Sequence, residues 1–184
     1  NGIDKKSNLE VLELSKKYDN VYAAIGYDHS VVNEITDEDL KLLEDQLKNE
    51  KVVAIGEIGL DYYWIKDNKE KQKKLFIKEL ELAEKYNLPV IIHSRDAVQD
   101  VYDILKTRNL RGSIHCYSGS TEMAKEFIKI GFNIGIDGPI TFKNNKKQRE
   151  MVKNIDINHI LVETDSPYLS PEPNRGKVNT SLNL

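Results

Sequence analysis

Six short apolar runs, rich in β-branched residues, recur along the chain and limit what it can fold into. Each run is almost continuously hydrophobic, which is typical of parallel strands covered on both faces, whereas half-exposed strands alternate. The runs are VYAAIGY (21–27), VVAIGEIGL (52–60), LPVIIHS (88–94), GSIHCYS (112–118), FNIGIDG (132–138) and HILVETD (159–165). We therefore predict six strands in a parallel α/β sheet.

Amphipathic helical segments separate these runs. The periodicity predicts helices near residues 69–87, 97–108, 121–130 and 145–154. Two earlier helices are expected to begin at capping boxes, Ser7 with Glu10 and Thr36 with Asp39. Their buried faces would be Val11, Leu14 and Tyr18 in the first helix, and Leu40, Leu43 and Leu47 in the second.

Polar residues at strand ends select between two parallel architectures. A doubly wound sheet gathers its site at one switch point, whereas a barrel gathers side chains from strand after strand. Glu57, His93, His115 and Asp165 all lie at the C-terminal ends of predicted strands. We therefore predict a TIM-type (β/α)8 barrel, with residues 1–184 forming one domain.

The chain length and its ends predict that this barrel is truncated at both ends. A complete barrel takes about 250 residues, and the chain has 184. It opens with NGIDKK, without methionine, and closes with the polar tail KVNTSLNL. We expect a fragment that lacks a strand or two and their helices.

Composition excludes several classes of protein. Hydrophobic residues make up 39% and charged residues 31% of the chain, and no apolar run approaches the length of a membrane span. A net charge of -3 argues against binding nucleic acid with the whole surface, so any such partner needs a local site. The single cysteine, Cys116, excludes an internal disulfide and fits a reducing compartment. We expect a cytoplasmic protein.

Glu57 is the residue in these runs that most needs an explanation. Removing an ionised carboxylate from water costs several kcal/mol unless it is paired, so Glu57 either faces solvent or holds a cation. Alternation along a strand would place Glu57 on the face of Val53 and Ile55. In a barrel such a face turns to the axis, where His93 and His115 would meet Glu57. Together with Asp165 they make a nitrogen and oxygen set suited to zinc, manganese or a similar divalent ion.

Each of these residues also has a simpler interpretation. A histidine that ends a strand is usually a polar residue with satisfied hydrogen bonds, and Asp165 can cap the turn before Pro167. Glu163 shares a face with Asp165, and the strand can use either. His159 begins its strand at the opposite end and is interpreted as a surface residue. His29 follows a strand and stays an open candidate.

Four motifs resemble the TatD family of metal-dependent deoxyribonucleases, within the amidohydrolase-like barrels. They are GEIGLDYYW, PVIIHSRDA, IHCYSG and LVETDSPYLSPEPNRGK, in that order along the chain. The resemblance implies a metal-dependent hydrolase domain over residues 1–184, with two divalent ions (Mg, Mn or Zn). It implies that Glu57 bridges both ions, that His93 and His115 bind one, and that Asp165 belongs to the other and acts as base.

The chain departs from the family pattern at three points. The family's Asp-x-His-x-His strand is absent, which leaves the ion at Asp165 without its two histidine ligands and one of the two metal sites incomplete. The family's last helices, after PNRGK, are absent too. In GYDHS, Asp28 stands where the family usually has histidine, so a substrate contact there is in question.

The resemblance implies a two-metal hydrolysis of DNA, at single strands or ends, in which the ions activate a water. Arg95 and Arg175 are candidates to hold a phosphate, with surface ion pairs as the alternative. The basic run 143–153 either follows a nucleic-acid backbone or is a solvated helix face. Tyr62, Tyr63 and Trp64 either stack on unpaired bases or pack under a loop.

Two other functions remain open alongside the nuclease. One is a metal-dependent hydrolase of a small ester or amide, since similar barrels host many chemistries. The other is a non-catalytic fragment that keeps one metal site, for which the missing His-x-His argues. We expect the isolated chain to be inactive and its intact parent to be a nuclease. Cys116 is assigned no chemistry.

Overall fold

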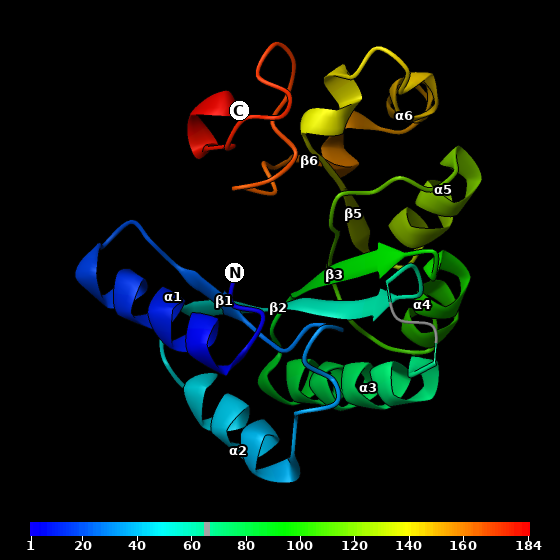
Figure 1. Cartoon of the computed structure of the whole chain (residues 1–184). Coiled ribbons are helices and arrows are strands. Elements are labelled where there is room, and N and C mark those ends of the chain that lie inside the picture. Colours follow the sequence, from blue (N-terminus) through cyan, green and yellow to red (C-terminus); the bar gives the residue numbers. More distant parts are fainter. Residues whose placement is uncertain (65–66) are drawn as a thin grey trace. The chain divides into compact units, whose positions relative to one another are not determined.

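The computed structural model describes residues 1–64 and 67–184 (Figure 1). Contacts along the chain divide it into two compact units, Asn1–Gly112 and Ser113–Leu184. Glu57 and His93 belong to the first unit, and His115 and Asp165 belong to the second. The prediction of a single domain stays a prediction.

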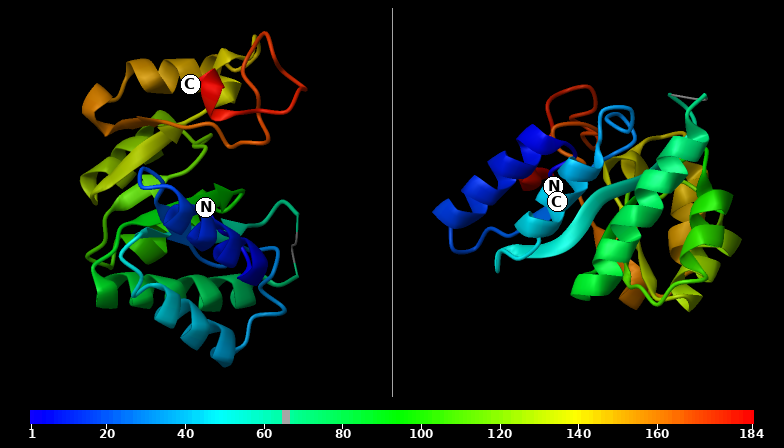
Figure 2. Two further views of the ribbon diagram at one scale, coloured as in Figure 1. Left: turned by 90° about the vertical axis from the view of Figure 1, so that its left-hand side faces the viewer. Right: turned by 90° about the horizontal axis from the view of Figure 1, so that it is seen from below.

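Helices and strands alternate through the first unit. Its elements are α1 (Lys5–Lys17), β1 (Ala23–Ile25), α2 (Asp37–Gln46), β2 (Val52–Asp61), α3 (Lys69–Tyr86), β3 (Val90–Arg95) and α4 (Val98–Leu105). Helix α1 packs against β1, α3 against β2 and α4 against β3. Helices α2 and α3 lie side by side (Figures 1 and 2), linked by ion pairs of Lys78 with Asp37 and of Lys85 with Glu44.

The second unit continues the alternation from β4, which starts at the last residue of the first unit. Its elements are β4 (Gly112–Ile114), α5 (Thr121–Lys129), β5 (Phe132–Ile136), α6 (Lys146–Lys153) and β6 (Ile160–Val162), with short 3-10 turns at Gly138–Thr141, Ile157–His159 and Ser181–Asn183. Helix α5 packs against both β5 and α6.

The strands follow one another in the sheet in the order of the sequence, β1 to β6. Within the units, β1 pairs with β2, β2 with β3 and β5 with β6, and each of these pairs is parallel. The order does not reverse, as it does at the switch point of a doubly wound sheet. The predicted parallel α/β fold is confirmed, although the strands stop short of their apolar runs. Strand β4, for example, ends at Ile114, before His115.

The helix ends confirm one predicted capping box and correct the other. Helix α2 begins at Thr36, whose hydroxyl accepts from Asp39 N while the Asp39 side chain accepts from Thr36 N. Helix α1 begins instead at Asp4, with Ser7 as the third helical residue, because the Asp4 carboxylate accepts from Ser7 N at 2.7 Å. The prediction that Ser7 caps this helix was wrong.

The buried face of α1 is also different from the predicted one. Leu14 and Tyr18 are exposed, and the buried residues are Asn8, Leu12 and Ser15. The Asn8 amide explains this choice, since it donates to Gly26 O at 3.0 Å and accepts from Gly26 N at 3.2 Å. Helix α1 therefore satisfies backbone groups just after β1 with a polar residue, which apolar periodicity does not reveal.

The pairing of β2 with β3 shifts register between Ile55 and Ile58, at Glu57. The alternation expected for β2 does not hold, because Val53 is exposed while Ile55 is fully buried. Beyond the shift, Gly59 pairs with His93 and has φ +143°, and a Cβ on it would lie 2.1 Å from His93 O. Glycine here lets β2 approach β3 closely enough to bring carboxylates of β2 beside His93.

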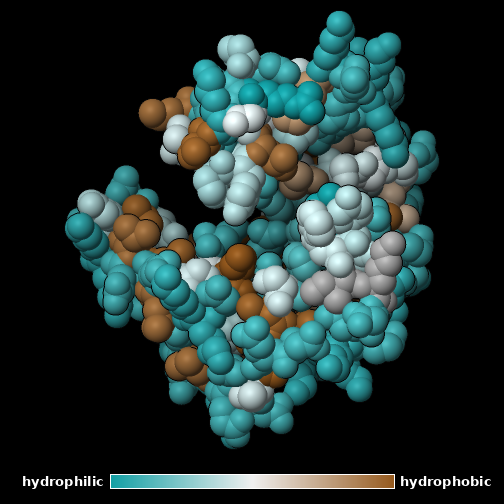
Figure 3. Space-filling view, in the orientation of Figure 1, coloured by the Kyte–Doolittle hydropathy of each residue, from teal (hydrophilic) through white to brown (hydrophobic). Residues whose placement is uncertain are grey.

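Apolar side chains of β1 to β3 and α3 form the core of the first unit. Ile25, Ile58, Ile92 and Leu80 are fully buried, and each such side chain contributes about 1.5–3 kcal/mol. The face of the molecule in Figure 3 is mostly hydrophilic, with hydrophobic residues in scattered groups. In the described part of the chain, no helix is both long and apolar enough to cross a membrane.

Candidate metal centre

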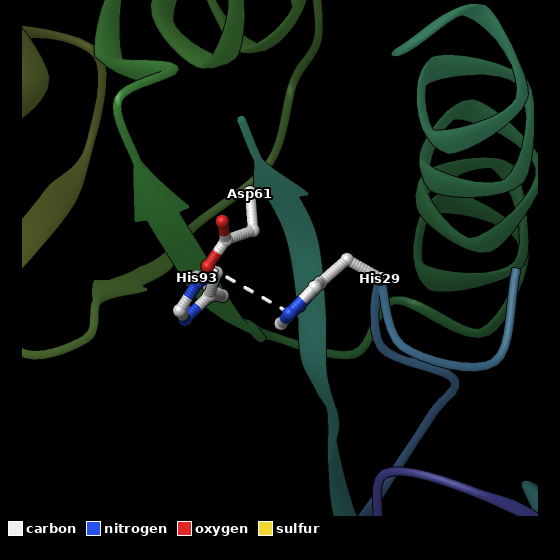
Figure 4. Close-up of side chains that lie close together, drawn as sticks. All are labelled: His29, Asp61 and His93. Carbon is white, nitrogen blue, oxygen red and sulfur yellow. Dashed lines mark hydrogen bonds and ion pairs between the residues drawn. The ribbon is translucent and has the colours of Figure 1, made fainter. Parts of the chain in front are cut away.

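Two neighbouring strands and one loop of the first unit bring four polar side chains together. Strand β2 carries Glu57 and, as its last residue, Asp61, while β3 carries His93. His29 comes from the loop after β1. Figure 4 shows that the side chains of His29, Asp61 and His93 point toward one another.

The His93 imidazole lies between two carboxylates of the first unit. Its Nδ1 is 2.9 Å from Glu57 Oε1, and its Nε2 is 3.1 Å from Asp61 Oδ2. Burial lowers the pKa of His93, but hydrogen bonds and charges of Asp61 and Glu57 outweigh it and raise this pKa to about 9. In this protonated form both ring nitrogens donate, one to each carboxylate.

Asp61 is the most firmly held side chain of this cluster. Its side chain is 1% exposed, and its Oδ1 accepts from the backbone N–H groups of Tyr63 (2.9 Å) and Trp64 (3.0 Å). Burial raises the pKa of Asp61, but the hydrogen bonds from His93 and from the two N–H groups outweigh it and lower this pKa to about 2. Asp61 is thus ionised and held in one orientation.

His29 completes the cluster from the loop after β1, near the same Asp61 oxygen as His93. Its ring stacks on His93 with centroids 5.1 Å apart and 17° between the planes, and its Nε2 is 3.7 Å from Asp61 Oδ2. Among the described residues, its buried Nδ1 has no hydrogen-bond partner. Asp28 Oδ2 lies 3.7 Å from this nitrogen, too far for a hydrogen bond. Burial lowers the pKa of His29, which favours the neutral imidazole that binds metals.

The second unit repeats the motif of an imidazole between two carboxylates. His115, buried just after β4, has Nδ1 2.9 Å from Glu163 Oε2 and Nε2 3.0 Å from Asp165 Oδ1. Glu163 Oε1 also accepts from Cys116 N at 2.6 Å. Glu163 and Asp165 were alternatives in the sequence, and the structure brings both to the same histidine.

Backbone features of the second unit make room for this arrangement. A Cβ on Gly135 would lie 2.3 Å from Glu163 Oε1, so glycine leaves room for the carboxylate in the position where it contacts Cys116 N and His115. Asp165 has φ +55° and Cys116 has φ +45°. Both residues thus adopt the left-handed conformation that redirects a chain sharply.

Two further groups of the second unit, the buried Asp137 and the half-buried Cys116, lie close to this motif. Asp137 is buried, and neither of its carboxylate oxygens has a hydrogen-bond partner among the described residues. Burial raises the pKa of Asp137. Burial and the charge of Asp137 also raise the pKa of the Cys116 thiol. A neutral thiol is a poor nucleophile.

The two arginines lie on aromatic rings. The Arg95 guanidinium is 4.0 Å from the Tyr63 centroid and 5.2 Å from the Trp64 centroid, and the Arg175 guanidinium is 4.1 Å from the Phe142 centroid. In the part of the chain that the structure describes, neither arginine forms an ion pair with a carboxylate. The surface ion pairs offered as their alternative role are therefore not seen there.

The structure brings Glu57 to His93 within the first unit and His115 to Asp165 within the second. That all four share a metal centre stays a prediction. Asp61, which touches His93, was not anticipated from the sequence. Its signal was its position directly after the predicted strand 52–60, four residues after Glu57 within the motif GEIGLDYYW.

The donor atoms present fit a divalent cation. His29, Asp61 and His93 each offer an atom within 4.8 Å of the others, and Glu57 adds a second carboxylate on His93. Imidazole nitrogens with carboxylate oxygens suit zinc and manganese, and carboxylates suit magnesium. The buried Nδ1 of His29, which has no hydrogen-bond partner among the described residues, is consistent with such an ion.

A family model and individual relatives both match this chain to metal-dependent hydrolases of one family. The family model described as TatD related DNase matches residues 1–184. The chain is 45% identical over 181 residues to "Uncharacterized metal-dependent hydrolase YabD" of Bacillus subtilis, covering 97% of this chain and 71% of that protein. It is 38% identical over 175 residues to "Uncharacterized metal-dependent hydrolase YcfH" of Escherichia coli, covering 93% of this chain and 65% of that protein.

A solved structure extends this similarity to the fold. The crystal structure of YJJV, a TatD homologue from Escherichia coli, superimposes with a TM-score of 0.90 at 34% identity, covering 97% of this chain and 70% of that one. The parallel sheet of this chain thus matches the TIM-barrel-like structure of a TatD homologue.

Proposed function

Since this chain belongs to the TatD related DNase family, we propose that the protein hydrolyses phosphodiester bonds of DNA with the help of bound divalent ions. One observation carries the proposal: two strand-end imidazoles, His93 and His115, each lie between two carboxylates. The relatives named above are described as metal-dependent hydrolases. We add the proposal that the bond hydrolysed is a phosphodiester of DNA. Residues 1–184 would act as one barrel domain, in the cytoplasm.

Glu57, His93, His115 and Asp165 are the ligands that we propose. In this assignment Glu57 faces Nδ1 of His93, while Asp61 accepts from the opposite nitrogen and fixes the ring. Metal-bound histidines usually have such a carboxylate on their second nitrogen. Glu163 plays the same part for His115. Two ions, Mg, Mn or Zn, would lower the pKa of a bound water and stabilise charge on the phosphate.

The chain's own residues supply the remaining roles. The Asp165 side chain is 27% exposed, so one carboxylate oxygen can accept a proton from a water while the other faces His115. Arg95 and Arg175 carry guanidinium groups without a carboxylate partner among the described residues, and each can bind two phosphate oxygens through its planar fork. DNA single strands or ends are the proposed substrate.

The test is release of nucleotides from single-stranded DNA by the full-length protein with Mg2+ or Mn2+. We expect release that is abolished by Glu57→Ala and unaffected by Glu50→Ala, an exposed glutamate in the same unit. No release from a protein with measured bound metal would overturn the nuclease. Turnover is also measured on a panel of small esters and amides. Hydrolysis of these compounds without release of nucleotides would favour a hydrolase of small esters or amides.

The 184-residue chain needs its own assay, because it spans 65–71% of the relatives described above. Turnover by this chain would exclude a non-catalytic fragment. Metal bound at one equivalent without turnover would favour a fragment that keeps one site.

A further inference from the structure

Two aromatic side chains and one arginine form an exposed cluster directly beside the candidate centre. Tyr63 is 48% and Trp64 66% exposed, and their ring centroids lie 4.8 Å apart in an edge-to-face arrangement. The Arg95 guanidinium lies over both rings, at 4.0 Å and 5.2 Å from their centroids. Tyr62, by contrast, is buried and donates its hydroxyl to Asp100 Oδ2 at 2.7 Å.

The cluster is linked to His93 through the Asp61 carboxylate and through strand β3, which carries both His93 and Arg95. Asp61 accepts from Tyr63 N and Trp64 N with one oxygen and faces His93 Nε2 with the other. Arg95 follows His93 by two residues on β3, pairs with Asp61 in the sheet register, and accepts through its carbonyl from Tyr62 N at 2.9 Å. The same carboxylate thus orients the imidazole and holds the backbone segment that carries the aromatic rings.

The cluster has the chemistry of a nucleotide subsite. Arg95 has no carboxylate partner among the residues that the structure describes, so its N–H donors are available to a phosphate. Exposed aromatic faces attract unpaired bases, and arginine adds both cation–π and phosphate contacts. A paired base in a duplex already has both faces stacked, which excludes it from such a ring.

From this geometry we propose that Trp64, Tyr63 and Arg95 bind one unpaired nucleotide of the DNA substrate, with its base on the aromatic rings and its phosphate on Arg95. This inference rests on the proposed function, because it names the part of the substrate that lies next to the cleaved bond. It identifies single strands or frayed ends as the substrate.

Tryptophan fluorescence tests the subsite directly, because Trp64 is the sole tryptophan of the chain. A hydrolysis-resistant phosphorothioate oligothymidylate is titrated into the metal-loaded protein, against an abasic phosphorothioate oligomer of the same length and charge. We expect saturable quenching by oligothymidylate and at least about fivefold weaker binding of the abasic oligomer, since stacking accounts for most of that difference. Unchanged fluorescence at concentrations that saturate binding, equal affinity for the two oligomers, or no binding of either would overturn the subsite.

Variants separate stacking from a change in structure. Trp64→Ala should weaken oligothymidylate binding at least about fivefold in fluorescence anisotropy, and Trp64→Phe should restore most of it. The matched control is Tyr22→Ala, since Tyr22 is another exposed aromatic of the first unit with a cation, Lys51, over its ring at 4.8 Å. An equal effect of Tyr22→Ala and Trp64→Ala would overturn the assignment.

The outcomes also distinguish this inference from the proposed function. Base-dependent quenching without any nucleotide release would support the subsite and overturn the nuclease. Nucleotide release with normal binding by Trp64→Ala would keep the nuclease and overturn the subsite.

Discussion

The carboxylate of Asp61 and the imidazole of His93 lie 3.1 Å apart, at the ends of the neighbouring parallel strands β2 and β3. Two backbone N–H groups hold the carboxylate from behind, so the imidazole has one preferred orientation. That orientation turns Nδ1 toward Glu57. Asp61 and His93 therefore place His93 Nδ1 and Glu57 Oε1 next to each other, where both atoms can bind the same cation.

Asp61→Asn should weaken metal binding without removing a proposed ligand. The amide keeps the shape of the carboxylate but loses its charge, so the His93 ring is oriented less strongly. Loss of such a partner typically reduces metal affinity by about 10–100-fold. Calorimetric titration with Mn2+ or Zn2+ measures the change, with Asp19→Asn, at an exposed position of the same unit, as the control. Equal affinities of wild type and Asp61→Asn would contradict this role.

Glu57→Ala should remove bound metal, because it deletes the carboxylate that faces His93 Nδ1. Elemental analysis after purification without chelator gives the metal content per chain. We expect about one ion fewer than in the unchanged protein, whereas Glu50→Ala should keep the full content. An unchanged content in Glu57→Ala would exclude Glu57 as a ligand.

Glu79→Gln should stabilise the fold at neutral and higher pH. Glu79 is fully buried, its Oε1 accepts from Tyr27 N at 2.7 Å, and its Oε2 has no hydrogen-bond partner among the described residues. Burial raises the pKa of Glu79 well above its ordinary value, so the folded state keeps a proton that the unfolded state releases. Stability is then greatest below the ordinary glutamate pKa and falls as the pH rises toward the folded-state pKa, by at most about 1.4 kcal/mol per pH unit.

Urea unfolding at a series of pH values from 4 upward measures this dependence. Glutamine keeps the acceptor for Tyr27 and carries no charge, so the decline should be smaller in Glu79→Gln than in wild type. The exposed Glu81 of the same helix gives the control, Glu81→Gln. Parallel pH curves for wild type and Glu79→Gln would refute the prediction.

Gly135→Ala should disturb the second unit through Glu163. The added Cβ would lie 2.3 Å from Glu163 Oε1, so the carboxylate must move away from His115. Overpacking costs about 1–3 kcal/mol in a rigid core, and we expect a loss near the lower end of that range because the clashing atom ends a flexible side chain; denaturant unfolding measures it. In a Glu163→Ala background the same substitution should cost less, since the clashing oxygen is gone. The same cost in both backgrounds would show that the strain lies elsewhere.

The sequence predicted the sheet well because parallel strands covered on both faces must be apolar, and each run became a strand. Thr36 was recognised because its capping box is entirely local. The buried face of α1 was predicted wrongly because Asn8 is buried, where its amide bonds with the backbone of Gly26, eighteen residues away. No local sequence pattern reveals that contact.

The site was predicted in part for the same reason. Glu57 and His93 were visible as polar residues in apolar runs. Asp61 was missed because its contact with His93 depends on the register shift in β2 and on the close approach at Gly59. His29 stayed open because its contacts come from a loop, and a loop's path is set by the tertiary structure.

Cys116 offers a way to time local motion. Its thiol is half-buried and has a raised pKa, and its backbone N–H donates to Glu163, so alkylation should be slow in the folded segment and faster when the segment opens. The rate of Cys116 alkylation then measures how often the loop that carries His115 opens. Because Cys116 is the single cysteine of these 184 residues, mass spectrometry can measure that rate without an introduced probe.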